Sequence, residues 1–167
     1  YCRLSDCSSA LNCVMIALKQ AQELGRPGPL SRSLNVFGLV NAALGDNERA
    51  MDMLARAVTA AEDDGGLEVR FAAQVNLAIM LSGIARRQRY LGDPEAARAW
   101  ARPALEALQA AAVLARGNPQ REMYCSGNES VLHEHLGDLP AMKAAVDRSK
   151  VLAAQLGLPH FLAKSNL

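Results

Sequence analysis

One tripeptide recurs along the chain and constrains its fold more than any other feature. Leu-Gly-Asp occupies 44–46, 91–93 and 136–138, and a degenerate Leu-Ser-Asp occupies 4–6. The four aspartates therefore follow one another at intervals of 40, 47 and 45 residues. A break that returns at such a period is typical of stacked helical hairpins.

The chemistry of the tripeptide is that of a corner between two helices. Glycine adopts the left-handed conformation that ends the first helix, and aspartate accepts hydrogen bonds from the first backbone N–H groups of the second. Pro94 follows Asp93 at the first helical position, where its missing N–H costs nothing. An amphipathic run with steps of three and four residues follows each aspartate, so each corner is expected to begin a helix.

The breaks divide the chain into helices of definite length. The composition agrees, because 50% of the residues are apolar but only 4% are aromatic, which disfavours a β-sandwich or barrel. Pro103 falls inside one of these helices and predicts a bend or an interruption there. The expected helices are 7–24, 30–44, 47–62, 67–91, 94–115, 120–136 and 139–156, with another beginning near 159.

The 167 residues are expected to form one array, 1–167, and both ends fall where the repeat pattern is incomplete. We therefore expect a piece of a longer protein. A terminal hairpin without its neighbour leaves an apolar face uncovered, so self-association through the end helices is also expected. The residues concerned are Ala10, Val14, Ala17 and Leu18 at one end and Phe161, Leu162 and Leu167 at the other.

Charge and cysteine content exclude several classes of function. Eighteen Lys and Arg nearly cancel 17 Asp and Glu, which argues against a nucleic-acid or membrane-surface protein. The densest apolar run, 77–81, is far shorter than the roughly 20 residues of a membrane span. The four cysteines form no CxxC pair and have no zinc-site spacing, so we expect reduced thiols and a cytoplasmic setting. They are Cys2, Cys7, Cys13 and Cys125.

Catalytic and metal sites are weakly supported by the sequence. Glu129 and His133 share a helix face, but His135 points away from it, so a surface or packed pair is favoured over a metal site. Cys125 or Ser126 with His133 is the nearest approach to a nucleophile and base, and no GxSxG motif accompanies it. Neither GxxxxGK[ST] nor GxGxxG occurs. We therefore predict a protein that is not an enzyme and that has no metal or cofactor.

The corners and the residues after them resemble the tetratricopeptide repeat (TPR). That family places a small residue, a large apolar residue and Ala at fixed steps after its Gly-Asp corner, and a small residue at the eighth position of the preceding helix. Most of the family's Trp and Tyr positions are missing here, and the period exceeds its usual length of about 34 residues. The matching residues are Ala50, Leu54 and Ala57; Ala10, Val14 and Ala17; Ala97, Ala101 and Ala104, with a small middle residue; and, more weakly, Met142, Val146 and Ser149, with Gly38, Ala85 and Ser130 as the small residues of the preceding helices.

The resemblance implies an all-α, right-handed α-α superhelix whose first helix in each hairpin lines a concave groove. Arg and Tyr are frequent in interfaces, so an acidic peptide or protein segment is the expected partner. The family's chaperone-tail clamp is not present. Carried over by register, the groove residues would be Arg32, Asn35, Ser82, Arg86, Arg89, Tyr124, Asn128 and His135.

The long, Ala- and Arg-rich repeats are similar to arrays in front of bacterial diguanylate cyclase (GGDEF) domains and in helical-repeat transcriptional activators. This similarity implies a non-enzymatic interaction or sensory module of a bacterial signalling protein. The alternative is a small-ligand sensor that controls an attached cyclase or DNA-binding domain. A closed pocket would favour the sensor, and an open groove would favour the interaction module.

Overall fold

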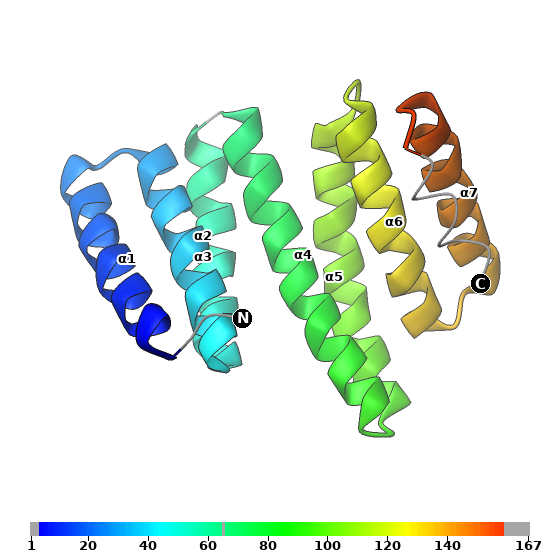
Figure 1. The fold of residues 1–167 in the computed structure, drawn as a ribbon, viewed down its shortest axis with the longest axis horizontal. Coiled ribbons are helices and arrows are strands. Elements are labelled where there is room, and N and C mark those ends of the chain that lie inside the picture. Colours follow the sequence, from blue (N-terminus) through cyan, green and yellow to red (C-terminus); the bar gives the residue numbers. More distant parts are fainter. Residues whose placement is uncertain (1–3, 65, 159–167) are drawn as a thin grey trace. The chain divides into compact units, whose positions relative to one another are not determined.

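A computed structural model of the chain describes residues 4–64 and 66–158, and throughout this part the protein is all-α, as predicted. Seven helices and no strand occur in these residues (Figure 1). They are α1 (Leu4–Leu24), α2 (Pro27–Leu44), α3 (Asn47–Asp64), α4 (Leu67–Tyr90), α5 (Pro94–Ala115), α6 (Pro119–Leu136) and α7 (Leu139–Gln155).

The corners have the predicted chemistry. Gly45, Gly92 and Gly137 have φ angles of 87°, 83° and 80°, the left-handed conformation that ends a helix. Asp93 accepts a hydrogen bond from the backbone N–H of Ala96 at 2.9 Å. The caps at the other two corners are equivalent, because Asp46 accepts from Arg49 at 3.1 Å and Asp138 accepts from Ala141 at 3.0 Å.

Three helices differ from the expected ones by more than one or two end residues. α2 begins at Pro27 and not at 30, because prolines in a first turn need no hydrogen-bonded N–H and so do not break the helix. α1 begins at Leu4, which places the degenerate Leu-Ser-Asp in its first turn. α5 is not interrupted at Pro103 but runs continuously past it. The helix expected near 159 lies outside the described residues.

The chain falls into two compact units, residues 1–80 and 81–167, with the division inside α4. In unit 1, α1 packs on α2, and α2 packs along α3. The buried residues of these helices meet the first half of α4 in one apolar core. Its members are Val14, Leu34, Phe37, Met53, Ala57, Ala61, Val69 and Ala73, with the partly buried Leu11, Leu18 and Leu30 packed against them.

Unit 2 has the same construction from different residues. α5 packs on α6, and α6 packs along α7. Leu108 and Leu132 are among the largest fully buried side chains, and alanines fill much of the remaining interior. Small buried residues let helices approach closely, which accounts for the abundance of alanine in this sequence. The buried alanines are Ala85, Ala97, Ala101, Ala104, Ala107, Ala111, Ala115, Ala145 and Ala153.

α4 is the one helix of the described residues that is long and apolar enough to cross a membrane, by length and composition alone. The lack of a long unbroken apolar run predicted no membrane span. That criterion was too strict, since α4 reaches the necessary length and mean hydropathy without such a run. Only 28% of the apolar window of this helix is buried, and a single helix of this kind also occurs in water-soluble proteins. The finding is therefore weak evidence for a membrane span.

Candidate functional site

A contact between Arg89 at the end of α4 and Glu134 at the end of α6 brings together several of the residues expected in a groove. Arg89 donates from Nη1 to the backbone oxygen of Glu134 at 3.1 Å, and the same atom lies 3.4 Å from Glu134 Oε1. Arg86 lies one turn before Arg89 and is close enough to His135 to act on it electrostatically. We call Arg86, Arg89, Glu134 and His135 the α4–α6 cluster.

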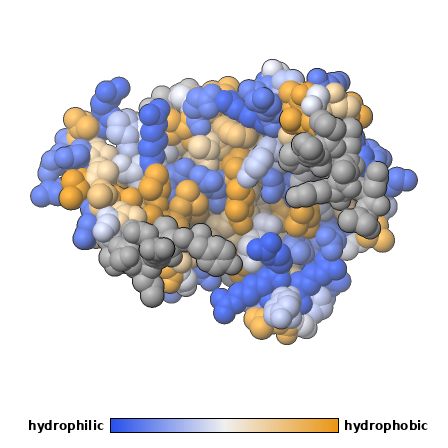
Figure 2. Space-filling model, viewed as in Figure 1, coloured by the Kyte–Doolittle hydropathy of each residue, from blue (hydrophilic) through white to orange (hydrophobic). Residues whose placement is uncertain are grey.

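Arg86 is the group in this cluster that is free to meet a partner. Its side chain is exposed, and within the described residues it forms no ion pair. Arg89 is also about half exposed but is held by Glu134. Figure 2 shows hydrophilic side chains beside apolar ones at this end of α4, where Tyr90 is also exposed. The cluster therefore presents positive charge to solvent.

His135 lies beneath these charges as a neutral ring. It is 8% exposed, and neither of its ring nitrogens has a hydrogen-bond partner in the described structure. Burial lowers the pKa of this imidazole, and the positive charges of Arg89 and Arg86 lower it further, while Glu134 opposes them. His135 therefore adds no charge to the cluster near neutral pH.

Two other expected groove residues interact on α6 itself. Asn128 donates from Nδ2 to the backbone oxygen of Tyr124 at 2.8 Å, so one of its amide hydrogens is already used. Tyr124 is 43% exposed, and burial of the remainder raises the pKa of its hydroxyl. Ser82, on α4, is half-buried. Tyr124 thus offers an exposed aromatic surface on the helix that carries His135.

The remaining two expected groove residues, Arg32 and Asn35, belong to α2 in unit 1. Arg32 is exposed. Asn35 Oδ1 accepts from Nδ2 of Asn76 on α4 at 3.2 Å. The sequence did not identify Asn76, because residues 41 positions apart carry no local pattern that pairs them.

The two candidate nucleophiles, Cys125 and Ser126, lie in environments that do not activate them. Ser126 donates its hydroxyl to the backbone oxygen of Glu122 at 2.9 Å. Burial raises the pKa of the Cys125 thiol to about 11, and the carboxylates of Glu129 and Glu122 act in the same direction. Such a thiol is protonated at neutral pH and is a poor nucleophile.

The metal and disulfide alternatives also lack support in the described part of the chain. Glu129, the carboxylate one helical turn before His133, is paired with Arg148 of α7. No three His, Cys, Asp or Glu side chains of the described residues come together as metal ligands. Cys13 and Cys125 are free thiols, the first exposed and the second buried.

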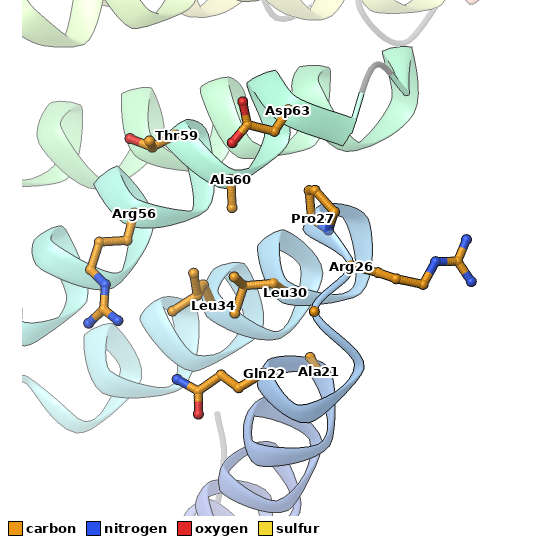
Figure 3. A pocket seen from close by; sticks show the side chains of 11 residues that line it. Ala21, Gln22, Arg26, Pro27, Leu30, Leu34, Arg56, Thr59, Ala60 and Asp63 are labelled. Atoms are coloured by element: carbon orange, nitrogen blue, oxygen red, sulfur yellow. The ribbon is translucent and has the colours of Figure 1, made fainter.

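A pocket of about 440 Å³ lies in unit 1 between α1, α2 and α3, and no pattern in the sequence pointed to it (Figure 3). Leu30 and Leu34 of α2 form its floor, and Ala21 of α1 and Ala60 of α3 form opposite walls. Its polar residues come from α1, α3 and the α1–α2 turn. They are Gln22, Arg26, Arg56, Thr59 and Asp63.

No protein-family model matches the sequence, and no curated protein shows significant similarity to it. Two features of the described residues are candidates for a functional site. One is the α4–α6 cluster with its exposed arginine, and the other is the pocket between α1, α2 and α3.

Proposed function

We propose that this chain is a non-enzymatic interaction module that binds an acidic peptide or protein segment. The observation that carries the proposal is Arg86, an exposed guanidinium without an ion-pair partner among the described residues, beside Arg89 at the end of α4. A guanidinium has five donors in a planar fork that matches a carboxylate. An acidic segment would complete the hydrogen bonding of Arg86 without breaking an existing ion pair.

The architecture supports the same proposal. Corners closed by a left-handed glycine and an aspartate cap are those of helical hairpins that stack in sequence. We infer a TPR-like right-handed superhelix in which the first helix of each hairpin lines the groove. Ser82, Tyr124 and Asn128 would extend the binding surface of the α4–α6 cluster in unit 2, and Arg32 and Asn35 would be the corresponding residues of unit 1. The setting we propose is a cytoplasmic signalling protein of bacteria, with an output domain such as a diguanylate cyclase.

The test is binding of a fluorescent peptide that alternates Glu and Leu, measured by anisotropy. We expect Arg86→Glu to weaken binding at least tenfold, because it replaces attraction by repulsion, and added salt to weaken binding to the wild-type protein. Arg102→Glu is the matched control, since Arg102 is an exposed arginine on α5 of the same unit. Equal losses in both variants, or equal binding of a Lys and Leu peptide, would refute a specific acidic site.

A second function, sensing of a small ligand, is favoured by the pocket in unit 1. The volume of this pocket is about 440 Å³. Small-molecule sites in proteins have volumes from about 300 Å³ to about 1000 Å³, so the pocket is large enough for such a ligand. In this proposal the ligand changes the activity of an attached output domain. The measurement is the output activity of the full-length protein with and without a ligand that fills the pocket.

A further inference from the structure

The pocket between α1, α2 and α3 exists because the residues at its opposite walls have small side chains. Ala21 projects from α1 and Ala60 from α3, and Gly25, at the end of α1, has no side chain. Leu34, in the floor, is 2% exposed and belongs to the core of unit 1. The floor is therefore rigid and apolar, and it favours a ligand with an apolar body.

The polar side chains are distributed unevenly around this apolar floor. Arg56 from α3 and Gln22 from α1 extend toward the same side of the pocket, whereas Arg26 extends away from it (Figure 3). Asp63 lies seven residues after Arg56 on α3, a rise of about 10 Å along the helix axis. One end of the pocket thus carries a guanidinium and an amide, and the other end carries a carboxylate.

Among the described residues, the guanidinium of Arg56 makes only weak contacts. Its Nη1 atom lies 3.5 Å from Asp52 Oδ2, and both side chains are more than half exposed. The same atom lies 3.9 Å from the sulfur of Met53. An exposed ion pair of this kind contributes little to stability, so a ligand can replace Asp52 at small cost.

We propose that this pocket binds an amphipathic monocarboxylate, with its carboxylate on Arg56 and Gln22 and its apolar body on Leu30 and Leu34. Arg56 offers the carboxylate a planar donor fork, and Gln22 adds an amide N–H donor. Asp63 repels a negative group, so the carboxylate lies at the Arg56 end and the apolar body points toward Pro27. This inference rests on the second of the proposed functions and names the class of ligand for it.

The test uses decanoate as the probe, below its micellar concentration, with isothermal titration calorimetry and amide NMR shifts on the whole chain. We expect one site per chain and shifts at Leu30 and Leu34. Arg56→Gln should weaken binding at least tenfold, since charge-assisted hydrogen bonds contribute this much. Arg49→Gln is the matched control, because Arg49 lies two turns earlier on α3 and does not line the pocket.

Filling the pocket gives a second, independent test. Ala60→Phe should abolish decanoate binding, whereas Ala110→Phe, at an exposed alanine of α5, should leave it unchanged. Circular dichroism melting checks that both variants fold. The proposal is overturned if the wild-type chain does not bind decanoate, if Ala60→Phe binds it normally, or if decan-1-ol binds as tightly as decanoate. These binding measurements do not need an output domain. If decanoate binds but does not change the activity of the output domain in the full-length protein, the sensing function fails while the binding proposal stands.

Discussion

Gly38 of α2 lies so close to Leu54 of α3 that a Cβ on residue 38 would stand 2.7 Å from Leu54 Cγ. The same Cβ would lie 3.1 Å from the backbone oxygen of Ala50, so no single rotamer change of Leu54 removes the overlap. Gly38 is thus the contact point that sets the separation of α2 and α3.

We expect Gly38→Ala to destabilise the protein by about 1–3 kcal/mol, because the added methyl overpacks a buried contact. The control is Gly83→Ala on α4, where a new Cβ meets nothing within 4 Å. That change should stabilise the helix by about 0.5–1 kcal/mol. Urea unfolding measures both free energies, and similar values for the two variants would contradict the close contact at Gly38.

The aspartate caps are expected to contribute to the free energy of unfolding. Asp138→Ala removes the acceptor for the N–H of Ala141 and should cost about 1 kcal/mol. Asp147 is an exposed residue inside α7. Its replacement by Ala should change the free energy of unfolding by at most about 0.5 kcal/mol. Thermal and urea unfolding of the pair distinguish a cap from a general effect of removing a negative charge.

The contact between Arg89 and Glu134 predicts a small effect on stability. Because both side chains are about half exposed, Arg89→Ala should cost about 1 kcal/mol or less. Arg89→Glu should cost more, since it places two carboxylates side by side, and Arg89→Glu with Glu134→Arg should recover part of the loss. A double-mutant cycle without coupling would show that the pair is not formed in solution.

His135 predicts a pH dependence of stability with a definite sign. Its folded pKa lies below the ordinary value of 6.5, so the unfolded chain takes up a proton at higher pH than the folded protein does. This contribution is fully present above pH 6.5 and is lost as the pH falls toward the lowered folded pKa. His135→Leu should flatten the decline between pH 7.5 and 5.5, and an unchanged slope in urea unfolding would contradict the prediction.

Self-association through α1 remains a prediction, but the structure changes the residues that can mediate it. Val14 and Leu18 pack in the core of unit 1 and are not available, whereas Met15 and Ile16 are 51% and 61% exposed. Exposed apolar side chains that lie together favour contacts with another molecule. Ile16→Glu should therefore raise the dissociation constant in sedimentation velocity, and Gln109→Glu on α5 should not.

The parts of the fold that depend on neighbouring residues were predictable. The corner at Gly45 and Asp46 is made within a few residues, so its composition identifies it. The start of α2 was predicted three residues too late, because Pro27, Gly28 and Pro29 are typical of a break, yet they lie in the first turn of the helix. Local sequence patterns could not predict contacts between residues that are far apart in the sequence, such as the hydrogen bond between Asn35 and Asn76.

The sites were predictable only in part. Register along α4 and α6 predicted Arg86, Arg89 and His135 as groove residues, and this stays a prediction. It could not show that Glu134 holds Arg89 or that His135 is buried. The pocket could not be predicted from the sequence, for another reason. It is a volume left empty between three helices by Ala21 and Ala60, and no motif marks an empty space.

Each corner is complete within a few residues, since the glycine ends one helix and the aspartate caps the next without help from elsewhere. A duplication or deletion between two such corners would leave intact the glycine that ends one helix and the aspartate that begins the next. The length of a chain built in this way can change by whole hairpins during evolution, and no existing corner has to be redesigned.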